Sequence, residues 1–350
     1  MMGSWSTPFP ATEFTQPQTN SSICEIQDGF LAVTLPVMYS LIFIISLLSN
    51  MLALWVFWLH MQRKTSITVY MRNLALSNLL LSLCLPFRVA YQNQSSPLIL
   101  CTVVGAFFYL NMYVSIMFLS LISLDRYLKI IRPLQQSKIH TLPCSTVAAR
   151  VVWLAYAIFT LSFFFKTREK GPYADNCFHC RSKRPLGAAL NMVAVATFFI
   201  HLPLFLYFYG KISAKLHNVS SGKAQQQSRR TSSRSITKTF VVLVIFTVCF
   251  APYHFVRMPY RDYSPTYTYI LAQRDVISST QWKQALHLTN KLVLCILAPN
   301  SCLDPVIFFF LSSSFRKAVL CTIQGKLKRA LLRNQGALNH SKSITEPGQD

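Results

Sequence analysis

Hydrophobic residues along this 350-residue chain are gathered into long blocks, and short polar segments separate the blocks. Seven blocks are evident, each near the ~20 residues that an α-helix needs to cross a bilayer. They lie at about 30–59, 66–92, 98–126, 147–166, 187–214, 238–261 and 284–310. The polar segments leave no room for a soluble domain, so the pattern predicts an all-α membrane protein with seven transmembrane helices.

The composition agrees with a membrane protein. Hydrophobic residues make up 52% of the chain and charged residues 13%, whereas about a quarter of residues are charged in soluble domains. The blocks do not form two inverted halves, which disfavours a transporter. A channel or transporter stays an alternative, because polar residues such as Asn50, Asn78 and Asp304 lie inside the blocks. No His-Glu-x-x-His or serine-nucleophile motif occurs in the sequence, so an enzyme is not indicated.

The positions of the basic residues predict the orientation in the membrane. Lys and Arg concentrate after the first, third, fifth and seventh blocks, which places those segments in the cytoplasm and the N-terminus outside. The first 29 residues lack the features of a cleaved signal peptide, so the first block is expected to direct insertion. The sequons at Asn20 and Asn93 then lie outside, where they can be glycosylated. Because topology explains most of the net charge of +23, nucleic-acid binding is not implied.

Some basic residues fall on the outer side instead. The segment 166–184 holds six of them against Glu169 and Asp175, while Arg88 and Arg257 lie near the outer ends of the second and sixth blocks. One interpretation is that these side chains extend toward lipid head groups. The other is a pocket for an anionic, phosphate-bearing ligand, since guanidinium groups match phosphate oxygens.

An acid and a base stand side by side at the end of the third block. No charged residue occurs between Arg88 and Asp125, where the stretch Asp125-Arg126-Tyr127 begins. Cys101 opens the block, and Arg126 follows 25 residues later, a helical rise of ~38 Å. The pair therefore lies at the cytoplasmic mouth, where Arg126 can exchange partners without being buried in hydrocarbon.

These motifs resemble those of the rhodopsin-like (class A) G-protein-coupled receptors along essentially the whole chain. Besides Asp125-Arg126-Tyr127, the resemblance rests on "SLLSNMLALWVF", "FTVCFAPYHFVR" and "APNSCLDPVIFFFLSSSFRK". It implies a seven-helix bundle with a short amphipathic eighth helix, a multi-pass location in the plasma membrane and a heterotrimeric G protein as partner. In the family, the counterpart of Arg126 is held by its neighbouring acid in the inactive state. The switch residues implied are Asp125, Arg126, Tyr127, Phe250, Pro252, Asp304 and Pro305.

The resemblance also divides the chain and assigns its outer cysteines. Residues 1–29 form an extracellular tail, 30–311 the receptor domain and 312–350 the eighth helix with a cytoplasmic tail. Cys101 is expected to pair with Cys177, and we suggest that Cys24 pairs with Cys180. Outside the cell a disulfide is favoured over metal binding by the Cys177-Phe-His-Cys180 stretch, and no metal or cofactor is expected. Cys321 is either a palmitoylation site or a structural cysteine.

Within the family, the stretches "CLPFR", "FFYLNMYVSI" and "NSCLDP" resemble the purinergic-receptor-like cluster. That cluster includes receptors for ADP, for UDP-sugars and for lysophosphatidylserine, and "LISLDRYLKI" is most similar to the last. The resemblance implies a receptor for an anionic lysophospholipid that signals through an inhibitory-type G protein. A nucleotide or nucleotide-sugar receptor is the alternative. The ligand-binding positions implied are Arg88, Tyr109, Tyr113, Arg181, Phe205, Arg257 and Asn290.

The chain departs from the family pattern at three positions. Asn78 replaces the second-span acid that contributes to a sodium site, which leaves Asp304 as one carboxylate. Phe308 replaces a tyrosine near the inner end of the seventh span. Lys291 stands where many relatives carry an acid. Ligand binding is expected to survive these changes, whereas signalling efficiency or basal activity is expected to shift.

Overall fold

The fold is almost entirely helical. The computed structural model describes residues 29–59, 65–91, 96–131, 141–164, 173–174, 185–221, 226–257, 288–289 and 291–325. The elements that follow one another along the chain are α1 (Gly29–Leu59), α2 (Ser66–Ala90), β1 (Ser96–Pro97), α3 (Leu98–Ile131), α4 (Leu142–Phe164), β2 (Tyr173–Ala174), α5 (Pro185–Ser221), α6 (Gln226–Arg257) and α9 (Asn300–Leu311). Residues 291–297 and 313–325 are also helical.

Within the described residues, each predicted hydrophobic block is largely helical, which confirms the fold class. Six apolar helical stretches in this part are long enough to cross a membrane: Val33–Leu59, Ser66–Ala90, Ile99–Ile131, Leu142–Leu161, Val195–Lys215 and Lys291–Leu311. The apolar part of α6 is the shorter stretch Phe240–Val256. Because lipid offers no hydrogen bonds to the backbone, a helix that satisfies its own backbone groups is the expected form for each block.

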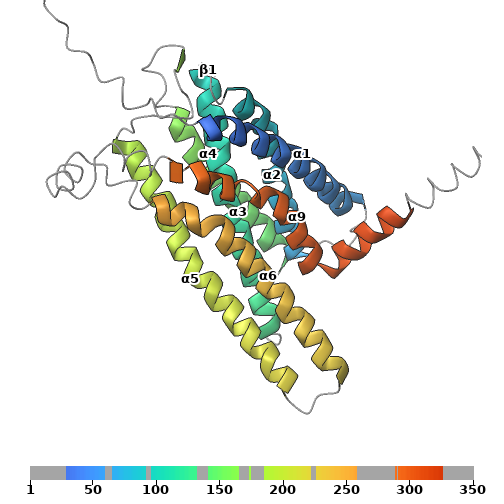
Figure 1. Ribbon diagram of the computed structural model, residues 1–350. Helices are drawn as coiled ribbons and strands as arrows, with labels where there is room; N and C mark the ends of the chain where they lie inside the picture. The colour runs from blue at the N-terminus through green and yellow to red at the C-terminus, as the bar shows by residue number, and fades with distance from the viewer. Residues whose placement is uncertain are drawn as a thin grey trace, which may run out of the picture.

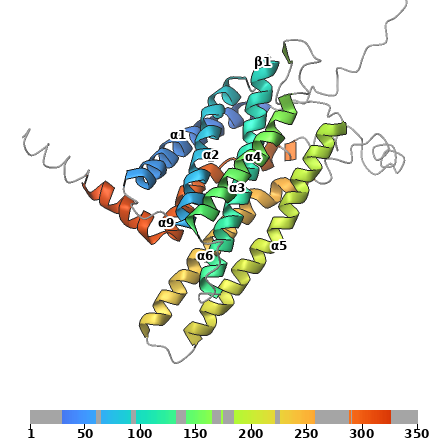
Figure 2. The ribbon, with the colours of Figure 1, turned by 180° about the vertical axis from the view of Figure 1, so that it is seen from behind.

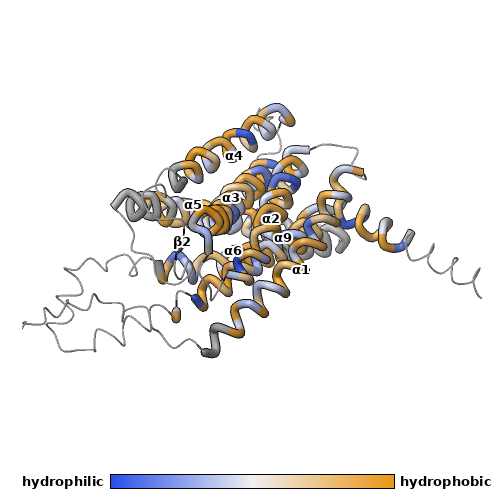
Figure 3. The backbone as a smooth tube through the Cα atoms, turned by 90° about the horizontal axis from the view of Figure 1, so that it is seen from above, coloured by the Kyte–Doolittle hydropathy of each residue, from blue (hydrophilic) through white to orange (hydrophobic). Residues whose placement is uncertain are grey.

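The helices form an elongated bundle around α3. Figure 3 shows α3 in the middle of the bundle and α4 at its periphery. α3 packs against α2, α4 and α5, while α1 packs on α2 and α5 packs on α6. α9 contacts α1, α2 and α6 and so closes the ring of helices. In Figures 1 and 2, α5 and α6 run side by side and extend past the other helices at one end.

Several boundaries differ from the predicted ones. α3 continues to residue 131 instead of ending at 126, and α6 begins at residue 226 instead of 238. The hydrophobic pattern marks only the part of a helix that faces lipid or core, whereas backbone hydrogen bonds let the helix continue into polar surroundings.

The last span is interrupted at Ala298 and Pro299, where the helical residues 291–297 give way to a turn before α9. Pro299 has no N–H group to continue the helix, and its carbonyl accepts hydrogen bonds from the Cys302 and Leu303 N–H groups at 2.9 and 3.1 Å.

The helix over residues 313–325 follows directly and fits the predicted amphipathic eighth helix. Ser312 caps its start by accepting a hydrogen bond from the Phe315 N–H at 3.1 Å. Phe315 and Val319 are buried, whereas Leu320 and Ile323 are exposed. The Phe315 ring lies 4.9 Å from that of Phe57, so the buried face of this helix packs on α1.

A two-stranded antiparallel sheet lies beside the start of α3. Ser96 pairs with Ala174, and Pro97 pairs with Tyr173. β2 also contacts α3. β2 therefore lies against the end of α3 that carries Cys101.

Candidate functional site

Arg88 occupies an aromatic cradle formed by three helices. Its side chain is 8% exposed. The guanidinium carbon lies 4.9 Å from the Tyr39 ring centre of α1 and 4.6 Å from the Phe108 ring centre of α3. Because aromatic faces attract cations most strongly where water is excluded, this cradle holds a buried positive charge in place.

The seventh span contributes to the same corner. Cys295 of this span lies within electrostatic range of Arg88 and Tyr39, and Tyr109 of α3 packs edge-on against Phe108 with the ring centres 6.3 Å apart. Residues from α1, α2, α3 and the helix 291–297 thus meet at one place. This corner joins two of the predicted ligand positions, Arg88 and Tyr109.

Tyr113, another predicted ligand position, packs against α6. Its side chain is buried, and its ring packs edge-on against His254 of α6 with the centres 5.8 Å apart. His254 is fully buried, and its Nδ1 lies 2.7 Å from the Phe250 carbonyl oxygen. A carbonyl oxygen can only accept, so Nδ1 of His254 carries a proton. Tyr109 and Tyr113 lie one turn apart, and their rings pack on different neighbours, that of Tyr109 on Phe108 and that of Tyr113 on His254.

Stacked rings continue from His254 toward the cytoplasmic half of the bundle. His254 stacks on Phe198 at 4.0 Å between ring centres, and Phe246 stacks on Phe205 at 4.2 Å. Phe198 and Phe246 are 6.1 Å apart and nearly parallel. The predicted ligand residue Phe205 is 1% exposed and belongs to this contact between α5 and α6. The structure does not bring it together with Arg88.

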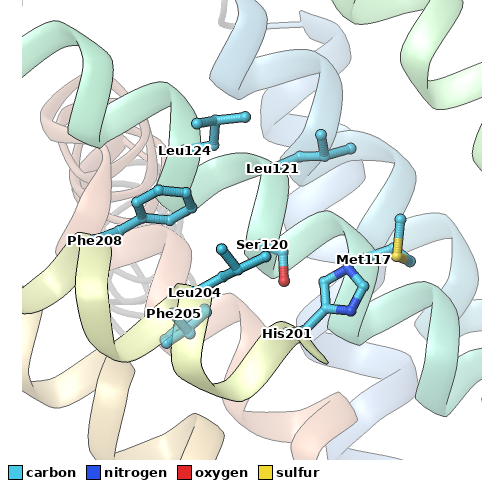
Figure 4. A pocket seen from close by; sticks show the side chains of 8 residues that line it. All are labelled: Met117, Ser120, Leu121, Leu124, His201, Leu204, Phe205 and Phe208. Carbon is cyan, nitrogen blue, oxygen red and sulfur yellow. The ribbon is translucent and has the colours of Figure 1, made fainter. Parts of the chain in front are cut away.

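An apolar groove lies between α3 and α5. Figure 4 shows its eight lining residues, which come from these two helices alone: Met117, Ser120, Leu121, Leu124, His201, Leu204, Phe205 and Phe208. The two polar groups bond within their own helices, Ser120 to the Ile116 carbonyl at 2.8 Å and His201 to the Thr197 carbonyl at 2.7 Å. Leu204 is 45% exposed, so the groove opens on the outside of the bundle.

A network of buried amides occupies the bundle interior. Asn78 donates to the Asp304 carboxylate at 2.9 Å and to the Asn50 side-chain oxygen at 3.2 Å. Asn111 donates to the Asn78 side-chain oxygen at 2.9 Å, and Asn50 donates to the Ser301 carbonyl at 2.9 Å. The amide at position 78 thus holds the Asp304 carboxylate by a direct hydrogen bond and ties four helices together.

Asp125 is held by two neighbours at the end of α3. Its carboxylate accepts a hydrogen bond from the Ser66 hydroxyl of α2 at 2.6 Å and pairs with the Lys129 ammonium at 2.6 Å. Lys129 also donates to Ser66 at 3.1 Å. The carboxylate is nearly buried, whereas the Lys129 side chain is half exposed.

Arg126 reaches across the bundle instead of binding its neighbouring acid. Its guanidinium donates to the Leu311 carbonyl at the end of α9. This differs from the arrangement that the resemblance implies for the inactive state, in which the adjacent acid holds the arginine. The reason is local: Lys129 and Ser66 already occupy Asp125, and the last carbonyls of a helix lack intrahelical partners.

The other predicted switch residues lie on α3, α6 and α9. Tyr127 packs on Phe208 at 5.0 Å, and Phe250 on Phe246 at 5.2 Å. Pro252 lies inside α6 and Pro305 inside α9, where each removes a backbone donor. Phe308 is fully buried among Phe57 and Phe315.

Cys101 is disulfide-bonded. The other six described cysteines are free, so its partner within the chain is one of Cys24, Cys177 and Cys180. Cys321 is exposed and free.

Several predicted positions fall outside the described residues. The side chain of Arg257 is among them, although α6 includes its backbone. The others are Asn20, Cys24, Asn93, Cys177, Cys180, Arg181 and Asn290. Their assignments stay predictions.

For four buried or ion-paired residues, no role was predicted from the sequence: Ser66, Lys129, His254 and Lys291. Lys291 is buried, with 6% exposure. Asp125 and Lys129 are four residues apart in a predicted helix, and this spacing could have predicted their ion pair. The Asp125 partner of Ser66 and the Tyr113 and Phe198 rings beside His254 lie on other helices, so no local pattern could have identified these contacts.

Known proteins resemble the chain over most of its length. Residues 49–308 match the family model of the 7 transmembrane receptor (rhodopsin family). Probable G-protein coupled receptor 34 of Pan troglodytes is 37% identical over 334 residues, which cover 93% of this chain and 83% of the relative. G-protein coupled receptor 87 of Mus musculus is 33% identical, covering 83% and 80%. Purinoceptor 14 of Bos taurus is 31% identical, covering 82% and 84%.

Proposed function

Because the chain belongs to the rhodopsin family of seven-transmembrane receptors, we propose that it is a plasma-membrane receptor for an anionic lysophospholipid. Lysophosphatidylserine is the leading ligand, and an inhibitory-type heterotrimeric G protein is the partner. In this proposal residues 1–29 are extracellular and carry glycosylated Asn20, while residues 312–350 are cytoplasmic and carry a lipid on Cys321. The second outer sequon, Asn93, is glycosylated as well.

The observation that carries the lipid assignment is the groove between α3 and α5. Its lining is apolar apart from Ser120 and His201, and those two groups already bond within their helices. An acyl chain needs such an apolar gap, and a groove open on the side of the bundle lets the chain enter from the membrane. Met117 lies one turn inward from Tyr113, so the groove continues inward from a predicted ligand position.

The head group is assigned to the basic residues of the outer half. Arg88 is fixed in its aromatic cradle, and the resemblance adds Arg181, Arg257 and Asn290. Guanidinium groups form paired hydrogen bonds with phosphate and carboxylate oxygens. Arg257→Ala is expected to weaken agonist potency by roughly tenfold to a hundredfold, the equivalent of one lost charge-assisted hydrogen bond of ~1.5–3 kcal/mol. Lys183→Ala, at the predicted rim, should change potency little.

A nucleotide receptor is the second candidate, favoured by the similarity to purinoceptor 14 and by the aromatic rings around Arg88, on which a base could stack. The two ligands differ in what accompanies the phosphate. A base requires aromatic and polar partners, whereas an acyl chain requires the groove.

The deciding experiment exposes cells that produce the receptor to lysophosphatidylserine, ADP and UDP-glucose and records G-protein dissociation. Leu204→Trp fills the groove, and Leu154→Trp, on the exposed side of α4, is the matched control. We expect lysophosphatidylserine to activate the receptor and Leu204→Trp to weaken it at least tenfold, with little effect of Leu154→Trp. Activation by a nucleotide alone, unaffected by Leu204→Trp, would overturn the lipid assignment.

A further inference from the structure

Arg72 lies on the face of α2 that is directed toward lipid. Leu76 and Leu83 follow it by four and eleven residues, a spacing that places all three side chains on one helix face, and both leucines are exposed. The same face continues to the exposed Phe87. Because α2 is long and apolar enough to span the membrane, these exposed apolar side chains contact lipid, and Arg72 extends toward the same lipid.

A hydrogen bond to α3 indicates the depth of Arg72 along the bundle. Ser66, the first residue of α2, donates to Asp125, so α2 begins at the end of the bundle that carries Arg126. Arg72 follows six residues later, ~9 Å along the helix. The distribution of basic residues assigns this end to the cytoplasm. On that assignment Arg72 lies close to the head groups of the inner leaflet.

Trp58 of α1 lies beside the Arg72 guanidinium. The Trp58 ring centre is 5.8 Å from the guanidinium carbon, across the contact between α1 and α2. Trp58 is 73% exposed, so its ring can pack on a lipid while it holds the guanidinium in place. An indole combines a large apolar body with one N–H donor, which suits the boundary between acyl chains and head groups.

Within the described part of the chain, the Arg72 guanidinium forms no ion pair and no hydrogen bond. The acidic residues of that part are Asp125 and Asp304. Asp125 is already paired with Lys129, and Asp304 lies in the buried amide network. A guanidinium without an anion is costly in hydrocarbon, and a lipid phosphate can satisfy it through two parallel charge-assisted hydrogen bonds.

We propose that Arg72 and Trp58 form a binding site for an anionic phospholipid of the inner leaflet. The guanidinium pairs with the lipid phosphate, the Trp58 ring packs on the region where head group and acyl chains meet, and one acyl chain lies along Leu76. A choline head group is disfavoured, because its ammonium would lie close to the guanidinium. The lipid is distinct from the extracellular ligand, so the site does not depend on the ligand proposed above.

The test titrates the purified full-length receptor with phosphatidylserine in detergent micelles and counts the bound lipid by native mass spectrometry. Arg150→Gln is the matched control, because Arg150 is exposed eight residues after the start of α4 and contacts no aromatic ring among the described residues. We expect Arg72→Gln to weaken phosphatidylserine binding about tenfold and Arg150→Gln to change it little. Trp58→Leu should weaken binding severalfold. Arg72→Lys should recover part of the affinity, because an ammonium lacks the guanidinium fork.

The melting temperature of each variant shows whether it is folded. If Arg72→Gln is not, Arg72→Lys and Trp58→Leu decide the test, and wild-type affinity in both would overturn the site. Equal loss in Arg72→Gln and Arg150→Gln, or no loss in either, would also overturn it, leaving a general attraction between basic residues and anionic lipid. Equal binding of phosphatidylcholine, or displacement of the lipid by inorganic phosphate, would overturn the assignment to an anionic phospholipid.

Discussion

Replacing Lys129 by Met should reduce signalling, because Lys129 determines which cation Asp125 binds. In the structure, Asp125 pairs with Lys129 and accepts from Ser66, while Arg126 donates to the Leu311 carbonyl. Without the ammonium, the Asp125 carboxylate keeps one neutral donor, and the adjacent Arg126 guanidinium becomes the nearest available cation. The family resemblance associates this arginine–acid pair with the inactive state.

The geometry sets the magnitude of the effect. Asp125 and Lys129 are 2.6 Å apart in an i,i+4 arrangement, with the lysine side chain 45% exposed and the carboxylate 4% exposed. Exposed pairs of this kind are worth about 0.3–0.5 kcal/mol, and breaking a fully buried pair costs about 3–5 kcal/mol. A half-exposed pair falls between, at about 1–1.5 kcal/mol, which shifts the equilibrium between the two Arg126 arrangements roughly fivefold to tenfold.

The measurement is G-protein dissociation in cells, without agonist and across an agonist titration, at matched surface expression. Lys129→Met should lower the basal signal and weaken agonist potency by roughly fivefold to tenfold, whereas Lys129→Arg should resemble wild type. Lys317→Met, an exposed lysine of the helix 313–325, controls for loss of a cytoplasmic positive charge. Unchanged or increased signalling in Lys129→Met would refute the reasoning.

Three further outcomes are expected. Phe308→Tyr places a hydroxyl in a fully buried aromatic cluster, which costs about 1–3 kcal/mol while the hydroxyl has no hydrogen-bond partner. If the active state supplies a partner, the substitution favours that state and the agonist-stimulated signal should rise; an unchanged signal would contradict this. Asn78→Asp removes the amide that donates to Asp304 and opposes two carboxylates; the solubilised receptor should lose about 1.5–3 kcal/mol of stability, visible as a lower melting temperature. Cys101→Ser removes a disulfide, typically worth about 2–4 kcal/mol, and surface expression measured by antibody binding should fall.

The helices could be predicted from the sequence because the hydrophobicity and length of each block are local properties. A run of apolar residues long enough to cross the bilayer must be helical in lipid, whatever its neighbours are. Helix ends were less predictable. α6 starts 12 residues before its predicted limit of 238. The run of hydrophobic residues ends at the membrane surface, whereas backbone hydrogen bonds let the helix continue beyond it.

The candidate site was only partly predictable, because its contacts depend on how helices rotate against one another. The ligand role of Arg88 stays a prediction, and its contacts with Tyr39 and Phe108 join three helices that no local pattern relates. Phe205 stacks on Phe246, 41 residues further along the chain, and no sequence spacing indicates this contact. The bond from Arg126 to Leu311 spans 185 residues, and no sequence spacing indicates it.

A continuous run of ring contacts on α5 and α6 leads from His254 toward the end of α3 that carries Arg126. His254 stacks on Phe198, and the rings of Phe246 and Phe205 continue the run to Tyr209, 4.6 Å from Phe205. The Tyr209 hydroxyl accepts a hydrogen bond from Ser123 at 3.1 Å, three residues before Arg126.

Because close-packed rings have no free volume between them, a displacement of one ring requires its neighbours to move or the stack to break. The helices that carry these rings are also those that project furthest beyond the bundle (Figure 1). We therefore expect a shift of α6 at the level of His254 to displace the end of the bundle that carries Arg126, and to change the balance between Leu311 and Asp125 as partners of that arginine.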